Sequence, residues 1–150
     1  MTKILFVCLG NICRSPMAEA VMKKLAAERG LSAEFEIASA GTSDEERGNG
    51  VYPPAARKLR EKGVEVPRRG AVRMTAADYA HYDLLIGMEE RNLAAMRRIA
   101  GGDPAGKICR LLDYTDRPGD VADPWYTGDF ETAYGDILRG CGDLLDYLTK

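Results

Sequence analysis

Short apolar runs alternate with helical stretches along the chain, and this alternation restricts the fold more than any other feature of the sequence. The runs fall at Lys3–Cys8, Glu34–Ala40, Tyr82–Met88 and Lys107–Leu112, and each has the length of a strand. Strands that alternate with helices are typical of a parallel sheet whose crossover helices cover both faces. We therefore predict a single-domain α/β fold with a four-stranded, mostly parallel sheet and helices on both faces.

Helical signals fill the gaps between these runs. Ser15 and Pro16 are a favoured N-cap and a favoured first residue, so the first helix is expected from about residue 16 to Arg29. Two further helices are expected at Pro53–Glu61 and Glu89–Ile99. The last stretch predicts the clearest helix, because its apolar side chains gather on one face. These side chains are Tyr134, Ile137, Leu138, Cys141, Leu144, Leu145 and Leu148.

Two polar stretches, Thr42–Tyr52 and Asp113–Asp129, are expected to be long loops. In open parallel sheets, ligands bind beyond the carboxyl ends of the strands. The first predicted strand ends at Cys8, so we expect the functional site there.

Length and composition restrict the class of protein. The chain has 150 residues, 45% of them apolar, which suits one packed domain over residues 1–150. A net charge of −2 gives no reason to expect a nucleic-acid partner, which usually requires a strong basic excess. The apolar run Ile4–Leu9 is too short to span a membrane, and Gly10-Asn11 follows it rather than a cleavage signal. We therefore predict a cytoplasmic protein without a membrane partner.

The four cysteines and the single histidine do not form a metal-binding pattern. A structural zinc site needs four ligands at close spacing, and the chain has no CxxC pair. A disulfide framework is not expected without a secretion signal. No metal or cofactor is predicted. Cys109, Cys141 and His81 are interpreted as structural residues, and Arg68, Arg69, Arg97 and Arg98 as solvated surface.

The segment Cys8–Ser15, with the sequence CLGNICRS, joins the first predicted strand to the first predicted helix. Gly10 permits unusual backbone angles and Asn11 tolerates them, so successive N–H groups can surround an anion. The helix N-terminus adds its dipole, and Arg14 adds a planar guanidinium suited to phosphate. The segment therefore predicts a phosphate-binding loop after the first strand. Leu9, Ile12, Cys13 and Ser15 are assigned to the same loop.

Cys8 lies at the centre of this positive field. Helix N-termini and nearby cations favour the nucleophilic thiolate form, and the Ser15 hydroxyl can donate to the sulfur. A thiolate beside a phosphate indicates covalent catalysis through a phosphocysteine. The leaving group then needs a proton, for which Asp123 in Asp-Pro-Trp-Tyr is the best candidate, before it acts as a base toward water. Neighbouring aspartates such as Asp120 leave open that Asp123 is a turn residue.

These residues resemble a known family. The strings FVCLGNICRSPMAEA at Phe6–Ala20 and ADPWY at Ala122–Tyr126 closely resemble the low-molecular-weight protein tyrosine phosphatases. SAGT at Ser39–Thr42, YDLLIGM at Tyr82–Met88 and DFETAY at Asp129–Tyr134 fit the same family, in the right order. The resemblance implies hydrolysis of phosphotyrosine in a protein substrate.

The resemblance also implies roles for single residues. Cys8 corresponds to the nucleophile, Arg14 to the phosphate-binding arginine and Asp123 to the general acid. Asn11 corresponds to the residue that orders the loop, and Ser15 to the hydroxyl that stabilises the thiolate.

Four further positions match the family in ways that bear on regulation and substrate. Cys13 corresponds to a second loop cysteine that can form a reversible disulfide with the nucleophile, although an inert loop residue is an equally good interpretation. Ile12 is typical of tyrosine phosphatases, whereas the related protein-arginine phosphatases usually have threonine. Trp125 and Tyr126 correspond to residues that flank the substrate ring.

Two positions depart from the family pattern. Many members have an aromatic residue in the loop after Thr42, where this chain has Ser43-Asp44-Glu45-Glu46-Arg47. The usual Met-Asp after the third strand is Met88-Glu89 here. We expect neither change to touch the chemistry. An acidic rim at Asp44–Glu46 is expected to disfavour acidic peptides if it faces the cleft.

Other functions are weighed against hydrolysis of phosphotyrosine. A protein-arginine phosphatase on the same scaffold is the nearest alternative. An arsenate reductase needs further cysteines to relay a disulfide, and none occurs between positions 14 and 108. A phosphocysteine carrier of the sugar phosphotransferase type needs neither Arg14 nor a late Asp-Pro acid. A cysteine protease needs a suitably placed histidine, and the chain has only His81.

Overall fold

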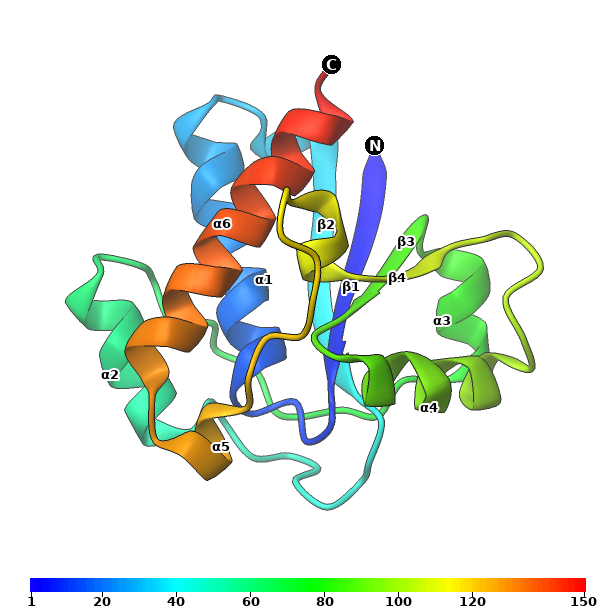
Figure 1. Ribbon diagram of the computed structural model, residues 1–150, viewed down its shortest axis with the longest axis horizontal. Helices are drawn as coiled ribbons and strands as arrows, with labels where there is room; N and C mark the ends of the chain where they lie inside the picture. The colour runs from blue at the N-terminus through cyan, green and yellow to red at the C-terminus, as the bar shows by residue number, and fades with distance from the viewer.

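A single parallel sheet lies between two layers of helices in the computed structural model, which describes residues 1–150 (Figure 1). The strands are β1 (Thr2–Cys8), β2 (Phe35–Gly41), β3 (Leu84–Gly87) and β4 (Ile108–Arg110). All of them run parallel in the order β2-β1-β3-β4. The predicted α/β fold with a four-stranded sheet is therefore confirmed.

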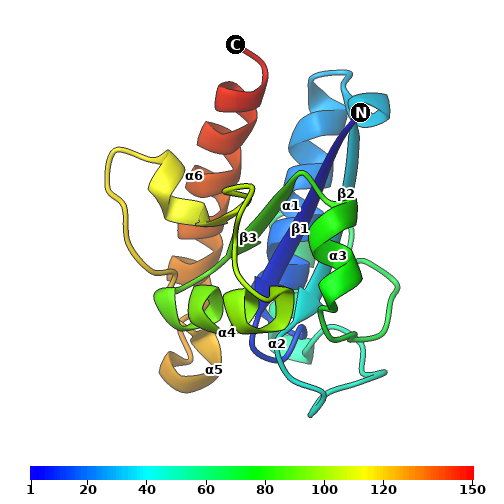
Figure 2. The same ribbon diagram turned by 90° about the vertical axis from the view of Figure 1, so that its right-hand side faces the viewer.

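The helices cover both faces of the sheet, as predicted. On one face lie α1 (Arg14–Glu28) and α6 (Phe130–Leu148), with α2 (Pro53–Glu61) packed beside them. On the other face lie α3 (Ala76–His81) and α4 (Glu90–Ala100), which Figure 2 shows in front of the sheet. No helix has the length and apolar character needed to cross a membrane.

β1 is buried on both of its faces because successive strand residues point to opposite sides. Ile4 and Phe6 belong to the larger core under α1 and α6, whereas Leu5 and Val7 belong to the smaller core under α4. This burial on both faces explains why the sequence of the strand is a continuous apolar run. It also fixes the end of β1, so Cys8, the last residue of the strand, is held between β2 and β3.

The end of β4 differs from the prediction of a strand over Lys107–Leu112. The strand stops at Arg110, and Leu111–Tyr114 forms a 3₁₀ helix, η2, that packs against α6. Gly140 of α6 makes room for this turn, since a Cβ there would lie 2.5 Å from a side-chain carbon of Leu111. Burial of Leu111 therefore bends the chain where its apolar pattern predicts more strand.

Short helical elements account for most other differences. η1 (Ser32–Glu34), α3 and α5 (Pro124–Thr127) lie where no helix was predicted, and α5 interrupts the predicted loop Asp113–Asp129. Each is six residues or fewer, too short for an apolar period to develop. On α6 the predicted apolar face is buried except at Leu148, which is half-buried, and Leu138, which is 40% exposed.

Candidate active site

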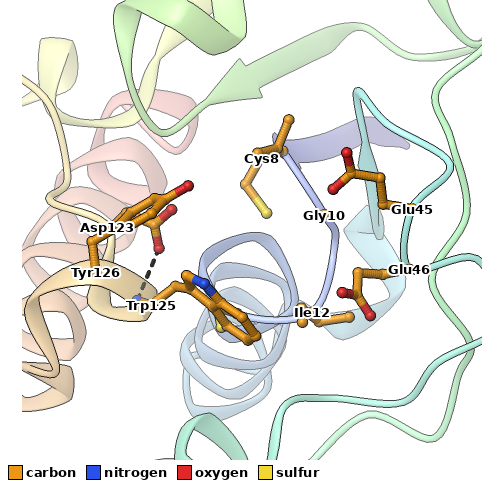
Figure 3. Close-up of a pocket in the computed structure, with 10 residues that line it drawn as sticks. Cys8, Gly10, Ile12, Glu45, Glu46, Asp123, Trp125 and Tyr126 are labelled. Atoms are coloured by element: carbon orange, nitrogen blue, oxygen red, sulfur yellow. Dashed lines mark hydrogen bonds between the residues drawn. The ribbon is translucent and has the colours of Figure 1, made fainter.

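A pocket opens beyond the carboxyl end of β1, and the sulfur of Cys8 points into it (Figure 3). Three segments that are far apart in the sequence line this pocket. The loop after β1 forms its floor with Cys8, Leu9, Gly10, Ile12 and Cys13. The loop after β2 contributes Glu45 and Glu46, and the segment around α5 contributes Asp123, Trp125 and Tyr126. The fold thus brings together the two segments that the sequence singled out, Cys8–Ser15 and Asp123–Tyr126.

The loop between β1 and α1 has unused backbone donors. No backbone N–H from Leu9 to Cys13 donates a hydrogen bond within the protein. Asn11, with φ of 60°, is the single non-glycine residue in the left-handed region, and it turns the loop sharply. Consecutive free N–H groups in such a turn, at the start of a helix, form a site for an anion.

Gly41 allows this loop to lie directly against the end of β2. A Cβ at Gly41 would be 2.7 Å from the carbonyl oxygen of Leu9 and 3.2 Å from the backbone nitrogen of Asn11. Both contacts are with backbone atoms, which cannot move aside as a flexible side chain can. The glycine of the SAGT segment therefore sets the position of the phosphate loop.

The Cys8 sulfur has one side-chain partner. Its Sγ lies 3.0 Å from the Ser15 hydroxyl oxygen, which also lies 3.3 Å from the carbonyl oxygen of Ala40. A hydroxyl has a single proton, so Ser15 can donate it to the carbonyl of Ala40 or to a Cys8 thiolate. This use of Ser15 overturns its predicted role as N-cap, because α1 begins at Arg14 and Cys13 is the N-cap residue.

Asn11 is completely enclosed and connects the loop to its surroundings. Its Nδ2 donates to the hydroxyls of Ser15, at 2.8 Å, and Ser39, at 3.0 Å, while its Oδ1 accepts from the backbone N–H of Val72 at 3.1 Å. The Ser39 hydroxyl in turn donates to the buried carboxylate of Glu19 at 2.6 Å. This network holds the left-handed conformation of Asn11 and orients the hydroxyl beside Cys8.

Arg69 belongs to the same network, so its prediction as a solvated surface residue is wrong. One of its guanidinium nitrogens, Nη2, donates to the backbone carbonyl of Asn11, and the other, Nη1, is buried with no hydrogen-bond partner. Burial lowers the pKa of Arg69, while Glu19 and Cys8 act in the opposite direction. Arg68 beside it is exposed, as predicted.

Arg14 is buried, with 1% of its surface exposed, and has three protein partners. Its Nη1 donates to the carbonyl of Val121 at 2.7 Å, and its Nη2 contacts Glu89 at 3.0 Å and Asp123 at 3.2 Å. A buried guanidinium needs such compensation, because an unpaired charge is costly in a protein interior. The arrangement fixes the guanidinium beside the phosphate loop.

Asp123 has two structural partners. One carboxylate oxygen caps α5 by accepting from the backbone N–H of Trp125 at 3.1 Å, and the other contacts Arg14 at 3.2 Å. The side chain is 19% exposed and lines the pocket with Cys8. Figure 3 shows its carboxylate beside the opening, held by the bond to Trp125. Asp123 therefore combines a helix cap with access to a bound ligand.

Cys13 lines the pocket, but its pKa is raised, which is the opposite of what a nucleophilic cysteine requires. Burial raises its pKa to about 12, and the nearby Cys8 and Asp123 add to the shift. It is therefore a neutral thiol at physiological pH. The remaining two cysteines lie away from the pocket, Cys141 completely buried in α6 and Cys109 half-buried in β4.

Aromatic side chains form one wall of the pocket. Trp125 is 52% exposed and Tyr126 is 78% exposed, and both line the opening. The ring of Trp125 packs against Tyr52, with centroids 4.7 Å apart. Tyr52 thereby supports the wall from the end of the loop after β2.

Glu89 lies closer to the candidate catalytic residues than the sequence prediction implied. It was not expected to touch the chemistry, yet its carboxylate contacts the buried Arg14 at 3.0 Å. It also caps α4 through a reciprocal capping box with Asn92. Its place directly after β3, at the carboxyl edge of the sheet, is the signal that could have identified it.

A parallel sheet with a cysteine and an arginine in a loop at its switch point has the architecture of a cysteine-dependent phosphatase. A family profile described as low molecular weight phosphotyrosine protein phosphatase matches residues 3–150. The chain therefore belongs to this family, as its sequence motifs predict.

Individual relatives agree with this assignment. The low molecular weight protein-tyrosine-phosphatase YfkJ of Bacillus subtilis is 40% identical, over 100% of this chain and 97% of the relative. The crystal structure of YfkJ superposes with a TM-score of 0.95 at 39% identity, covering 99% of this chain and 94% of that one. A Drosophila arginine phosphatase has a TM-score of 0.90 at 28% identity, covering 99% of both chains.

Proposed function

We propose that the protein is a tyrosine phosphatase that hydrolyses phosphotyrosine esters through a phosphocysteine on Cys8. The observation that carries this proposal is the position of the Cys8 sulfur in a pocket shared with Asp123, above a loop whose five backbone N–H groups have no partner. The family membership supports the reaction class.

In the first step the Cys8 thiolate attacks phosphorus, so that the S–P bond forms as the P–O bond to the phenol breaks. The N–H groups of residues 9–13 and the guanidinium of Arg14 stabilise the oxygens of the transferring phosphoryl group. The Ser15 hydroxyl, 3.0 Å from the sulfur, donates to the thiolate before and after the transfer. Asp123 donates its proton to the departing phenolate.

Arg14 links phosphate binding to the release of Asp123. The guanidinium contacts both Glu89 and Asp123. A bound phosphate presents oxygens suited to bidentate pairing with arginine, and these compete with Asp123 for the guanidinium. Glu89 keeps the guanidinium in place, and Asp123 is then free to face the leaving group.

In the second step water breaks the S–P bond. Asp123, now ionised, takes a proton from this water, and the resulting attack on phosphorus releases phosphate and restores the Cys8 thiolate. Trp125 and Tyr126 form an aromatic wall beside the sulfur, which suits a phenyl ring. The cytoplasmic location and the protein substrate stay predictions.

Hydrolysis of p-nitrophenyl phosphate in the presence of a chelator tests the proposal. Wild-type protein is expected to be active without added metal, and Cys8→Ser is expected to lose on the order of 10⁴-fold or more, since the nucleophile is lost. Full activity in Cys8→Ser would exclude the mechanism. Parallel assays with phosphotyrosine and phosphoarginine peptides separate the two phosphatase classes, and a preference for phosphoarginine would overturn the substrate assignment.

A further inference from the structure

The wall of the pocket opposite the general acid is acidic. Glu45 and Glu46 line the same pocket as Cys8, and Figure 3 shows their carboxylates on the side away from Asp123 and Tyr126. Of the rim predicted at Asp44–Glu46, Glu45 and Glu46 therefore face the cleft, whereas Asp44 does not line it. A substrate whose phosphate reaches Cys8 has to pass between this acidic wall and the aromatic one.

The two glutamates have no cationic partner in the protein. Glu45 is exposed and its carboxylate takes part in no ion pair or hydrogen bond, while that of Glu46 accepts only from the side-chain amide of Asn49, at 2.6 Å. Neighbouring Asp44, by contrast, pairs with Arg47 at 3.0 Å and lies 3.7 Å from Arg73. The nearby arginines thus neutralise Asp44 and leave the pocket carboxylates uncompensated.

Glu46 is also held in position. Its side-chain carbon lies 3.3 Å from the site that a Cβ on Gly10 would occupy, so the residue packs directly on the phosphate loop. With the bond from Asn49, this contact directs its carboxylate to the pocket margin. A pre-positioned charge contributes more to recognition than a mobile one, because less side-chain entropy is lost on binding.

No lysine or arginine lines the pocket, so positive charge does not offset this wall. Arg14 is paired with both Glu89 and Asp123, and Arg69 donates to the carbonyl of Asn11. A phosphorylated substrate is itself an anion, so two unpaired carboxylates at the entrance reduce its binding unless the substrate carries a cation to meet them.

We propose that Glu45 and Glu46 select phosphotyrosine sequences with a lysine or arginine adjacent to the phosphorylated residue. This inference rests on the proposed tyrosine phosphatase activity. The phosphate enters the loop at Cys8, the ring lies against Trp125 and Tyr126, and the flanking basic side chain meets the acidic wall. Acidic flanking residues meet the same wall with repulsion.

The test compares kcat/KM for matched phosphotyrosine peptides with basic, neutral or acidic flanking residues. Wild-type protein is expected to prefer the basic over the acidic peptide by roughly three- to tenfold, the range for a few exposed charge pairs. In the double variant Glu45→Gln and Glu46→Gln, which keeps side-chain size, this preference is expected to disappear. Glu34→Gln is the matched control, because Glu34 is exposed at the end of η1, directly before β2 and at the opposite end of the sheet from the pocket.

Salt gives an independent measure of the same effect. At about 1 M ionic strength the Debye length falls to about 3 Å, so the preference for the basic peptide is expected to shrink toward onefold. A preference that persists in high salt, or one that the double variant retains, would overturn the inference. Equal kcat/KM for all peptides in wild-type protein would also overturn it.

Failure of this inference can be distinguished from failure of the proposed function. If p-nitrophenyl phosphate is hydrolysed by wild-type protein and not by Cys8→Ser, the phosphatase mechanism stands whatever the peptide preference. If a phosphoarginine peptide is preferred and the double variant loses that preference, the carboxylates recognise the guanidinium of the modified residue itself. That outcome would contradict selection of basic neighbours.

Discussion

The floor and the rim of the pocket are built in opposite ways. Directly beneath the floor, Asn11, Arg14 and Ser15 are at most 1% exposed, and each side chain has at least two hydrogen-bond partners. On the rim, Glu45 and Tyr126 are exposed and form no side-chain hydrogen bond. A rigid floor suits a reaction that requires fixed geometry. An open rim, by contrast, can be changed without disturbing that geometry, so it sets the choice of substrate.

This comparison predicts two kinds of variant. Changes on the floor should lower activity toward every substrate, whereas changes on the rim should alter the ranking of substrates by small factors. Loss of the nucleophile Cys8 is the largest expected effect, and the Glu45 and Glu46 pair is the smallest.

Asp123→Asn is expected to lower kcat by about 10²–10⁴-fold, because the leaving phenolate then receives no proton. The loss should be greater for phenyl phosphate than for p-nitrophenyl phosphate, since nitrophenolate is a better leaving group. Steady-state kinetics with both esters measure this difference.

Asp120→Asn is the matched control for Asp123. The Asp120 carboxylate pairs with Arg110 at 3.0 Å and accepts from the backbone N–H of Glu90, and it does not line the pocket. If the Asp120 variant lost more activity than the Asp123 variant, the general acid would be misassigned.

Arg69→Gln is expected to lower kcat/KM by about 10- to 100-fold, the range for one hydrogen bond to a charged group. The Asn11 carbonyl loses its donor, and the Cys8 thiolate loses a nearby positive charge. Competitive inhibition by inorganic phosphate should weaken by a similar factor, because the loop that binds phosphate loses its support.

Two variants sharpen the interpretation of Arg69. Arg69→Lys keeps the charge and a donor and should restore inhibition by phosphate, while Arg68→Gln removes an exposed charge next to it and should leave this inhibition unchanged. Wild-type kcat/KM and phosphate inhibition in Arg69→Gln would show that Arg69 does not support the phosphate loop.

Cys13 should not react with alkylating reagents in the folded protein at neutral pH. Its pKa is raised to about 12, so the nucleophilic thiolate forms only well above physiological pH. Iodoacetamide near pH 7 is expected to label Cys8 and leave Cys13 intact, as read by peptide mass mapping. Labelling of Cys13 in folded protein would contradict this difference.

The disulfide between Cys8 and Cys13 stays a prediction. Peroxide converts a thiolate to a sulfenic acid. A neighbouring thiol then attacks the sulfenic sulfur, which forms a disulfide and releases water. Mass mapping after mild peroxide separates the two interpretations, and a Cys8–Cys13 bridge would identify Cys13 as the redox partner. Sulfinic Cys8 without a bridge would leave Cys13 as an inert loop residue.

Much of the floor could be predicted because its information is local. A buried run followed by Gly10, Asn11 and Arg14 specifies strand, loop and helix within a few residues, and physical rules apply at that range. The alternation of apolar runs likewise predicted the parallel sheet. The position of Asp123 in the pocket could be expected because both segments follow strands that end at the same edge of the sheet.

Contacts that depend on distant segments were not predictable. Arg69 reaches the carbonyl of Asn11 across 58 positions, and nothing beside it in the sequence distinguishes it from the exposed Arg68. Glu89 reaches Arg14 across 75 positions. Ser15 looked like an N-cap because its local context favours one, but its hydroxyl bonds instead to Cys8 and Asn11. Tertiary contacts override local preference where the site is assembled.

The central claim is that the phosphoryl group passes through Cys8, and rapid acid quenching during turnover tests it most directly. Protein quenched while it hydrolyses p-nitrophenyl phosphate is digested, and the peptide that contains Cys8 is analysed by mass spectrometry. The mechanism predicts the added mass of one phosphoryl group on Cys8 in wild-type protein and none in Cys8→Ser. A phosphoryl group on another residue, or turnover with no modified cysteine at any quench time, would contradict the account.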